Sequence, residues 1–505
     1  MYKRALISVS DKTGLEEFLK PLVEQGLELV STGGTAKFLK SKNFKVQEVQ
    51  DLTSFPEALS GRVKTLHPFI FIPLLARDKV KEDQEAQKNY KIQTFHLLIV
   101  NLYPFETQAL QLEDKDKLEW IDVGGPSLLR AGAKNYPRIT TICDPNDYPK
   151  AQKGANLKMR KQLAVKAFKR LAQYDSAIAE SLNKKEQSAT EKKLSLNGSF
   201  FKKLRYGENP HQQASWFKTA EIGLHSAQVI QGKELSYNNI LDFETAVQTV
   251  RDFEEPCVTA VKHNNPCGVA IGDKISVCLE KALKADPISV FGGLLAFNQA
   301  LDKSCAEQLT NIFLEGLIAP DFSRVALDIL QNKKRLRVLK WSDMLSHSLT
   351  QHSLREVTGG FLLQDKDKAD KTWPKNWQIL GETPSPEVKR DILFAWKVCS
   401  HLKSNAIAIV KKGQSLGLGM GQVNRIDSVS LALTRRDRFH PQEKKDLILA
   451  SDAFFPFPDS IELAFKGGVR WIIQPGGSIK DQDILEKSSK LQLNMILTGQ
   501  RRFKH

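Results

Sequence analysis

The chain has 505 residues, with 74 Lys and Arg against 58 Asp and Glu, and a net charge of +16. This length is more than one ordinary hydrophobic core serves, so at least two domains are expected. No apolar run approaches the roughly eighteen residues of a membrane helix, which argues against a membrane protein.

The cysteines and the start of the chain indicate a cellular compartment. The six cysteines are scattered without a CxxC pair, which favours a reduced cytosol over a disulfide framework or a zinc site. The chain begins MYKRALISVSD, and Asp11 and Lys12 end its short apolar patch, so no signal peptide is expected. A cytoplasmic protein is predicted.

The excess of positive charge is spread over several segments. Nucleic acid would be one partner, because Lys and Arg release counterions from phosphates. No basic run is interleaved with aromatic residues, so a general attraction for anionic small molecules is the preferred interpretation. A nucleic-acid-binding protein remains an alternative of a different class.

The first 180 residues or so alternate short apolar runs with amphipathic segments. Strands are predicted at 4–8, 27–30, 97–100 and 139–142, and helices at 15–25 and 163–182. This alternation predicts an α/β domain with a mainly parallel sheet.

A polar segment, Asn183 to Ser199, reads as an interdomain linker. We therefore expect one domain over residues 1–195 and a second, mixed α/β domain with two subdomains over 200–505. The polar stretch from Asp365 to Lys371 is expected to be an exposed loop. No internal repeat of fixed period is visible.

Two loops of the first domain predict an anion-binding pocket. STGGT, from Ser31 to Thr35, lies between a strand and a helix at 36–40, where glycine amides and a helix N-terminus attract a phosphate. SVSDKTG has the same placement and adds Ser10 and Lys12. Both loops should lie at the carboxyl edge of the sheet.

Further polar side chains follow in the same domain. GRVKTLHP places Arg62 and Lys64 on one side of an extended segment, and NLYPF ends a strand with Asn101 and Tyr103. IDVGGPSLLRAGAKN is expected to put Asp122 at a strand end. The helix that follows carries Arg130 and Lys134 on one face, which could also be an ordinary wet surface.

The second domain contains the most informative segment, VKHNNPCGVA. An apolar strand, Cys257 to Val261, is expected to run into a Pro/Gly turn at Lys262 and His263. An ammonium beside an imidazole suits a reaction that develops an oxyanion while a proton is removed. The earlier LRYGENPHQ adds Arg205 and Tyr206, which suit a planar anionic ligand.

These strings, followed in order by SNAIAIV, GQVNR, SDAFFPFPD and QPGGSIKD, resemble the family of bifunctional purine-biosynthesis proteins that make inosine monophosphate (IMP). The resemblance implies an N-terminal cyclohydrolase domain with the methylglyoxal-synthase fold. It also implies a C-terminal transformylase domain with a cytidine-deaminase-like fold. Formyl transfer to aminoimidazole carboxamide ribotide (AICAR) would give its formylated form (FAICAR), which the cyclohydrolase closes to IMP.

The resemblance also assigns residues in the first domain. The residues that hold the nucleotide would include Ser10, Lys12, Ser31, Thr32, Gly33, Gly34, Arg62, Lys64, Thr65 and Asn101. Those around the closing ring would be Tyr103, Asp122 and Lys134, with Lys64 and Lys134 stabilising the alkoxide.

In the second domain, the resemblance implies that Lys262 polarises the formyl oxygen and that His263 handles the proton of the attacking amine. Asn405 would hold the folate and formyl group. The ribotide would be bound by Arg205, Tyr206, Arg425 and Arg501. The folate and base walls would be formed by Phe291, Gly292, Glu315, Phe454, Phe457 and Asp459, with at least one Phe of FFPF in a buried aromatic cluster.

The family uses 10-formyltetrahydrofolate as cosubstrate and no catalytic metal, and some members hold a structural potassium ion. NPCGV lacks the HxE and PCxxC signature of zinc deaminases. The implied partners are small-molecule nucleotide and folate substrates and a second copy of the chain, with transformylase sites at the homodimer interface. Neither nucleic acid nor a membrane is implied.

One segment departs from the family pattern. After TLHP the family has a short polar stretch with His and small residues, whereas this chain has FIFIP, Phe69 to Pro73. The shape of the cyclohydrolase pocket is therefore an open point. A single-activity transformylase, whose first domain only binds nucleotide, is the closest alternative.

Overall fold

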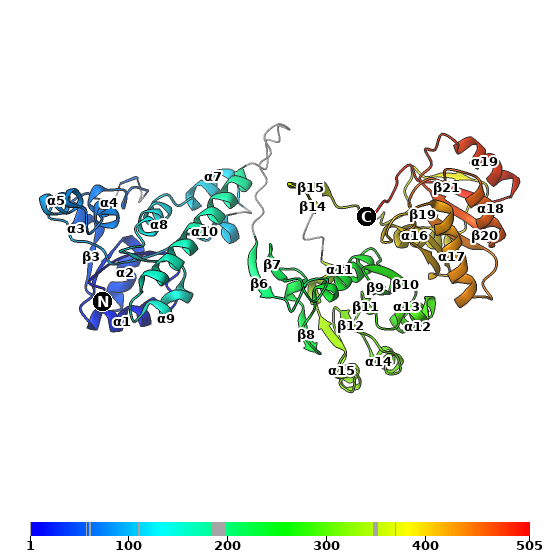
Figure 1. Cartoon of the computed structure of the whole chain (residues 1–505), viewed down its shortest axis with the longest axis horizontal. Helices are drawn as coiled ribbons and strands as arrows, with labels where there is room; N and C mark the ends of the chain where they lie inside the picture. Colours follow the sequence, from blue (N-terminus) through cyan, green and yellow to red (C-terminus); the bar gives the residue numbers. More distant parts are fainter. Residues whose placement is uncertain are drawn as a thin grey trace. The chain divides into compact units, whose positions relative to one another are not determined.

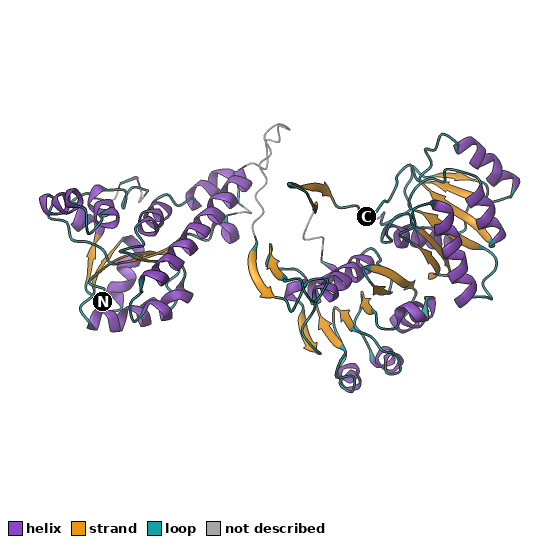
Figure 2. Cartoon of the chain, in the orientation of Figure 1, coloured by secondary structure: helices purple, strands orange, loops and turns teal. Residues whose placement is uncertain are grey.

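The computed structural model describes residues 2–56, 58–59, 62–109, 112–182, 198–346, 352–368 and 370–505. The chain divides into two compact units, Met1–Asn197 and Gly198–His505 (Figure 1). Both units combine helices and strands, as expected for an α/β protein (Figure 2). None of the helices in the described ranges is long and apolar enough to cross a membrane.

The first unit is built on a five-stranded parallel sheet with the order β3-β2-β1-β4-β5. The four predicted strands are confirmed, whereas the short, half-exposed β3 carries no apolar run to predict it. Because the sheet is parallel, the carboxyl ends of β1, β2 and β4 lie at one edge. The strands are β1 (Arg4–Val9), β2 (Glu28–Ser31), β3 (Val46–Glu48), β4 (Leu97–Asn101) and β5 (Thr140–Ile142).

Helices cover both faces of this sheet, since alternate strand residues belong to different cores. Leu6 packs in one core with Leu171 of α10, and its neighbour Ile7 packs in the other with Phe18 of α1. The helices are α1 (Leu15–Glu24), α2 (Gly33–Ser41), α3 (Val49–Thr53), α4 (Pro68–Leu75), α5 (Lys81–Asn89), α6 (Phe105–Gln108), α7 (Asp114–Lys117), α8 (Gly124–Lys134), α9 (Tyr148–Ala151), α10 (Leu157–Leu182) and the 3₁₀ helices η2 (Leu118–Trp120) and η3 (Pro145–Asp147).

The departing FIFIP segment is helical in this protein. It forms most of α4, and Ile70 and Leu74 are fully buried in the core that contains α8 and α10. His67 caps the helix by accepting a hydrogen bond from the amide of Phe69 through Nδ1, at 3.1 Å. The apolar residues therefore serve packing, which accounts for their size.

Two sequence expectations for this unit need comment. Asp122 does not end a strand: it follows η2 and precedes α8, and the three residues of η2 are too few to show a helical period in the sequence. Most of the predicted linker, residues 183–197, lies outside the described residues, and Ser199 already belongs to strand β6.

The second unit is built around a twelve-stranded mixed sheet with the order β16-β21-β20-β19-β17-β18-β10-β9-β11-β12-β13-β8. The strands of its first half are β8 (Gln228–Gln231), β9 (Cys257–Lys262), β10 (Asn265–Ile271), β11 (Leu294–Phe297), β12 (Gly316–Ala319) and β13 (Arg337–Lys340). Those of its second half are β16 (Gln378–Leu380), β17 (Ile407–Lys411), β18 (Gln414–Gly419), β19 (Leu447–Ser451), β20 (Val469–Gln474) and β21 (Asn494–Leu497).

The two halves are structural duplicates. The order β8-β13-β12-β11-β9-β10 is repeated as β16-β21-β20-β19-β17-β18, and in each half an antiparallel hairpin adjoins three parallel strands. The halves meet where β10 pairs with β18, with Ala270 opposite Gln414. The duplication was not predicted from the sequence, because the two halves share their topology without a sequence repeat of fixed period.

The helices repeat in the same way. One core joins the halves and packs the sheet against α11 and α16, while separate cores pack the other face against helices of each half. The helices are α11 (Tyr237–Arg251), α12 (Ile275–Ala285), α13 (Pro287–Val290), α14 (Lys303–Leu309), α15 (Arg324–Leu330), α16 (Pro386–Ser400), α17 (Arg425–Phe439), α18 (Asp459–Lys466), α19 (Asp481–Lys490) and the 3₁₀ helices η5 (Leu224–Ser226) and η6 (Ser342–Leu345).

Two hairpins stand outside the large sheet. They are β6 (Ser199–Lys203) with β7 (Ser215–Lys218), and β14 (His352–Val357) with β15 (Gly360–Asp365). The predicted exposed loop from Asp365 to Lys371 follows β15. It is not free, because Asp367 and Asp370 both accept hydrogen bonds from the buried guanidinium of Arg502 near the C-terminus.

Candidate active sites

The turn between β9 and β10 presents Lys262 and His263. Lys262 pairs with Asn265, so the turn consists only of His263 and Asn264. Both turn residues have positive φ angles, 53° and 60°, as in a two-residue type I′ hairpin turn. The backbone conformation that most residues avoid therefore occurs at the predicted catalytic histidine.

The prediction of a Pro/Gly turn at this place was wrong. Pro266 and Gly268 lie inside β10, on either side of a bulge. Gly268 is there because helix α12 approaches closely: a Cβ atom at this position would lie 2.3 Å from the backbone oxygen of Ala282. The glycine serves strand–helix packing and not the turn.

Lys262 lies beside two exposed aromatic rings, those of Phe291 and Phe313. Its Nζ donates to the backbone oxygen of Phe291 at 2.8 Å, which leaves two of its three N–H donors for a ligand. Gly292 has a φ of 73°, and a Cβ atom there would lie 3.9 Å from that Nζ and 3.6 Å from the ring of Phe313. The exposed rings of Phe291 and Phe313 lie 5.4 Å apart, and Phe313 was not predicted from the sequence.

Asp242 of α11 holds the turn from below. Its Oδ1 accepts the backbone N–H of Asn264 at 2.6 Å, and the hydroxyl of Thr245, one helical turn on, bonds the side chain of Asn264. Burial raises the pKa of Asp242, and hydrogen bonds from the amides of Asn264 and His263 oppose that rise. No motif in the sequence marks Asp242, because its partners lie some twenty residues further along the chain.

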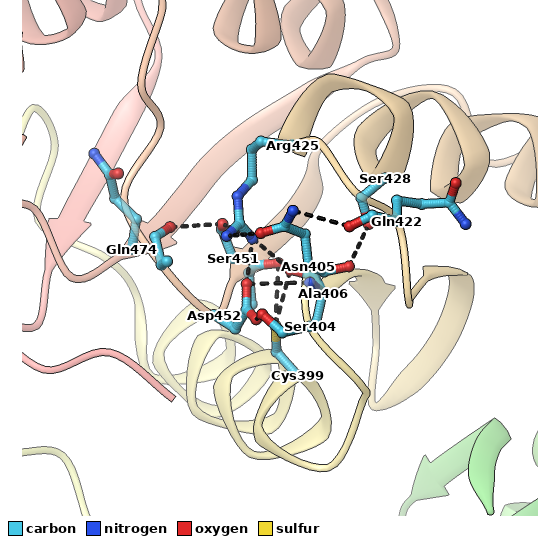
Figure 3. Close-up of polar contacts among 12 residues, drawn as sticks. Cys399, Ser404, Asn405, Ala406, Gln422, Arg425, Ser428, Ser451, Asp452 and Gln474 are labelled. Carbon is cyan, nitrogen blue, oxygen red and sulfur yellow. Dashed lines mark hydrogen bonds and ion pairs between the residues drawn. The ribbon is translucent and has the colours of Figure 1, made fainter. Parts of the chain in front are cut away.

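Asn405 lies in a polar network just before β17 (Figure 3). Its Nδ2 donates to the oxygen of Gln422 at 2.9 Å, and its Oδ1 accepts from Nη2 of Arg425 at 2.7 Å. The other arm of Arg425 forms an ion pair with Asp452, with side-chain exposures of 5% and 0%. Both side chains are fixed before any ligand arrives.

The guanidinium of Arg425 is held by several groups of the protein. Figure 3 shows its guanidinium pointing at Asp452 and Asn405, and all its hydrogen-bond partners belong to the chain. The predicted contact between Arg425 and the ribotide stays a prediction. Asp452 was missed, since only the fold reveals that this carboxylate neutralises Arg425.

The sheet brings Asn405 to the same end of the hairpins as His263. Because β10 and β18 run antiparallel, the start of β17 lies near the start of β10. The backbone amide of Lys403 accordingly bonds Oδ1 of Asn265 at 3.4 Å. Residues separated by about 140 positions thus meet at the junction of the two halves.

Several other predicted residues contact only close neighbours or different partners. Arg205 lies over the ring of Tyr206, at 5.6 Å, and Arg501 over that of Phe503, at 5.0 Å. Glu315 pairs with Arg337 at 2.6 Å. The structure does not itself join these groups to the Lys262–His263 turn.

The FFPF segment contains one buried ring, which packs in an aliphatic core and not in the aromatic cluster expected from the sequence. Phe455 is fully buried, whereas Phe454 and Phe457 are exposed. The ammonium of Lys480 lies 4.8 Å from the ring centre of Phe457, a cation–π contact that the sequence did not predict. The carboxylate of Asp459 accepts the amide of Ser460 at 2.6 Å at the start of α18.

In the first unit, Asn101 ties the SVSDKTG loop to the end of β4. Its Oδ1 accepts the amides of Ser10 and Asp11 at 2.6 and 2.9 Å, and its Nδ2 donates to the oxygen of Asp11. The side chain of Lys12 folds back to the oxygen of Ser10 at 3.3 Å. This loop and the STGGT loop lie at the same sheet edge, as predicted.

The STGGT loop opens α2. Thr32 is the N-cap and makes no side-chain capping bond, and Ser31 donates to the oxygen of Ile7 at 2.8 Å. A small pocket lies beside Gly33 and Lys64, where the unpredicted Glu48, Gln50 and Phe55 complete the wall. A helix N-terminus beside an ammonium group is suited to a phosphate.

Lys64 and Asp122 form the second part of this site. Burial raises the pKa of Asp122, while the amide of Gly125, at 2.9 Å, and the charge of Lys64 oppose the rise. A Cβ atom at Gly125 would lie 2.2 Å from Asp122, so the glycine makes room for the carboxylate. A Cβ atom at Gly124, the first residue of α8, would lie 2.7 Å from Oγ1 of Thr65.

The segment that carries Asp122 is anchored by a buried tyrosine. The hydroxyl of Tyr174 accepts the amide of Asp122 at 2.8 Å and donates to the oxygen of Trp120 at 3.0 Å. The exposed ring of Tyr103 lies edge-on to Trp120, at 6.5 Å, so Tyr103 is near this segment as predicted. Only the fold shows that Tyr174 belongs here.

Two predicted cations, Lys134 and Arg62, are exposed. Lys134 is the last residue of α8, and eleven residues at about 1.5 Å each separate it from Asp122 by roughly 16 Å. Arg130, on the same face, pairs with Asp175 at the surface. Arg62 pairs with Glu119 in an exposed ion pair. The roles of Lys134 and Arg62 stay predictions.

Within the described ranges, no cluster of three or more His, Cys, Asp or Glu residues could hold a metal ion.

Comparison with known proteins gives matches along the whole chain. A family model described as "AICARFT/IMPCHase bienzyme" matches residues 132–435, and one described as "MGS-like domain" matches residues 14–127. The latter covers much of the unit with the parallel sheet, where that fold is expected from the sequence.

Three curated relatives share the name "Bifunctional purine biosynthesis protein PurH". The chain is 45% identical to that of Aquifex aeolicus, over 99% of this chain and 100% of the relative. It is 44% identical to that of Caldicellulosiruptor saccharolyticus and 43% to that of Desulfitobacterium hafniense, each over 100% of both chains.

Proposed function

This chain belongs to the family of bifunctional purine biosynthesis enzymes, and we propose that its Lys262–His263 turn carries out formyl transfer. The enzyme formylates AICAR and closes the product, FAICAR, to IMP. Formyl transfer implies a formyl-folate cosubstrate. The single observation that carries the site assignment is that the half-buried Lys262 ends β9 and the exposed His263 opens the two-residue turn that follows it.

In the proposed step, the exocyclic amine of AICAR attacks the formyl carbon of 10-formyltetrahydrofolate. A new C–N bond forms, the carbonyl oxygen becomes an oxyanion, and the amine gives its proton to His263. Collapse of the oxyanion breaks the bond to folate N10, which takes up a proton. The free donors of Lys262 stabilise the oxyanion, an effect worth about 10²–10³-fold in rate.

Asn405 would orient the formyl group, held by Arg425 and Gln422 in the network described above. We assign Arg205, Tyr206 and Arg501 to the ribotide. The exposed rings beside Lys262 are suited to the flat folate ring, which supports placing it there.

Ring closure is proposed for the first unit. The carboxamide nitrogen of FAICAR attacks the formyl carbon, the alkoxide forms near Lys64, and water leaves as the ring becomes aromatic. Asp122 takes the proton that the carboxamide nitrogen loses and passes it to the oxygen that leaves as water. The burial of Asp122 and its proximity to Lys64 support this assignment, because both tune the carboxyl group for proton transfer.

The apolar FIFIP segment does not weaken this proposal. Ile70 is fully buried in the core, and none of the five residues lines the pocket beside Lys64. The bifunctional interpretation is therefore favoured over a single-activity transformylase.

The remaining proposals concern the localisation, the oligomeric state and a bound ion. We propose a cytoplasmic homodimer with transformylase sites at the interface, a state that sedimentation of the purified protein would test. A structural potassium ion is proposed on the resemblance alone, and exchange of potassium for sodium in the assay would test it.

A coupled assay on the purified chain tests the function. With AICAR and 10-formyltetrahydrofolate supplied, we expect loss of formyl-folate followed by the appearance of IMP. Accumulation of FAICAR without IMP would favour a single-activity transformylase. Salt-sensitive retention on nucleic acid without turnover would favour the nucleic-acid-binding alternative.

A further inference from the structure

The hairpin turn at the predicted transformylase site has a structural twin in the other half of the sheet. Lys412 and Gly413 form the two-residue turn between β17 and β18, with φ angles of 49° and 67°. They correspond to His263 and Asn264 in the duplicated topology. Both turns therefore adopt the same left-handed conformation at two successive residues.

An aspartate holds each turn from the preceding helix. Asp242 is the sixth residue of α11, and Asp391 is the sixth residue of α16. Asp391 accepts the amides of Lys412 and Gly413 at 2.5 and 2.7 Å, as Asp242 accepts that of Asn264 at 2.6 Å. Burial raises the pKa of both carboxyl groups, and the turn amides oppose the rise.

The equivalence extends to the lysine before each turn. Nζ of Lys262 bonds the oxygen of Phe291 just ahead of β11, and Nζ of Lys411 bonds that of Lys445 just ahead of β19. The clamp is therefore a repeated element of the fold. What differs is the turn itself: the first carries an imidazole at its tip, and the second carries Lys412 and a glycine.

We infer that Asp242 is a positioning residue for formyl transfer, whose carboxylate fixes the left-handed His263–Asn264 turn and so aims the imidazole at the reacting amine. This inference rests on the proposed function of His263. Asn and His adopt positive φ more readily than most residues but less freely than glycine, so a restraint from outside the turn adds to the stability of this conformation at His263 and Asn264. If φ of His263 relaxed to a negative value, its Cβ atom and ring would swing away.

The duplication provides a matched control for the experiment. Asp391→Ala removes the same clamp from a turn that has no assigned role in the reaction. We expect Asp242→Ala to lower kcat for formyl transfer about 10–100-fold, since a displacement near 1 Å is that costly. KM for AICAR and formyl-folate should change little, and Asp391→Ala should keep kcat close to wild type.

Two further variants distinguish an effect on the orientation of His263 from an effect on the stability of the folded protein. Asp242→Asn keeps an oxygen acceptor for the Asn264 amide and should recover most of kcat. Adding Asn264→Gly to Asp242→Ala should also recover part of it, because glycine adopts positive φ without a restraint. Thermal unfolding followed by tryptophan fluorescence serves as the folding control, because six of the seven tryptophans lie in the second unit, and it should be unchanged in Asp242→Asn.

The outcomes are distinct. No formyl transfer by the wild-type chain would overturn the proposed function itself. An active wild type with equal losses in Asp242→Ala and Asp391→Ala, or no loss in Asp242→Ala, would overturn the positioning role. If Asp242→Ala does not fold, Asp242→Glu and Asp391→Glu, which displace the acceptor by one methylene, make the same comparison.

Discussion

At the scale of single residues, the chemistry depends on charges that the fold has already oriented. Lys262 is the clearest case, because one backbone oxygen fixes its ammonium while the remaining donors stay free. A fixed cation stabilises a developing oxyanion without reorganising during the reaction. Arg425 shows the opposite arrangement, because its guanidinium forms a buried ion pair with Asp452.

Lys262→Ala should lower formyl transfer about 10²–10³-fold and leave ring closure intact, because it removes an oxyanion donor. The equivalent Lys411→Ala, in the duplicated half, is the control and should be nearly neutral. Combining Lys262→Ala with His263→Ala should cost far less than the product of the single losses, since both act on one transition state. Steady-state rates for AICAR formylation provide the comparison, and equal losses at Lys262 and Lys411 would contradict the assignment.

Asp122 predicts a pH dependence for ring closure. Its pKa is raised by burial, and the carboxylate must be ionised to accept a proton. Activity should therefore fall, on acidification, at a higher pH than an ordinary aspartate would give. Asp122→Asn should lose most activity and this acidic limb together. A wild-type limb that persists in Asp122→Asn would assign the titration to another group.

Arg425→Met should destabilise the second unit by about 3–5 kcal/mol, because it leaves the fully buried carboxylate of Asp452 without its opposite charge. The exposed pair of Arg390 and Glu255 is the control, and Arg390→Met should cost no more than about 1 kcal/mol. Denaturant unfolding followed by tryptophan fluorescence measures both. Similar small losses would show that Asp452 finds another partner.

At the scale of elements, apolar runs predicted the strands of the first unit, since buried parallel strands need continuous hydrophobic residues. The His263–Asn264 turn was not predictable, because neither residue is the usual glycine of a type I′ turn. The two loops proposed to bind phosphate could be placed at the sheet edge from the sequence, because each directly follows a predicted strand. Asp242, Asp452 and Tyr174 were missed because each acts on residues far along the chain.

Glycines in the two halves allow helices to touch strands, which gives a further prediction. A Cβ atom at Gly268 would lie 2.3 Å from the oxygen of Ala282, and one at Gly417 would lie 2.0 Å from that of Ala432. Substitution of either glycine by alanine should cost about 1–3 kcal/mol through overpacking. Gly360, with open space around it, is the control and should tolerate alanine. Thermal unfolding that ranks Gly360→Ala with the other two would refute this packing.

At the scale of the whole molecule, the chain carries two compact units, and the proposed sites for the two steps lie in different ones. A fragment of residues 1–195 should therefore fold and close supplied FAICAR by itself, because its sheet is covered on both faces by its own helices. Circular dichroism and the ring-closure assay test this. An unfolded fragment would place the boundary elsewhere.

The most direct test of the account uses His263→Ala in two separate assays, one supplied with AICAR and formyl-folate and the other with FAICAR. Removal of a positioned general base typically costs about 10²–10⁴-fold. The account predicts a loss of that size in the first assay and a wild-type rate of IMP formation in the second. Near wild-type formyl transfer by His263→Ala would contradict the assignment of this step to the β9–β10 turn.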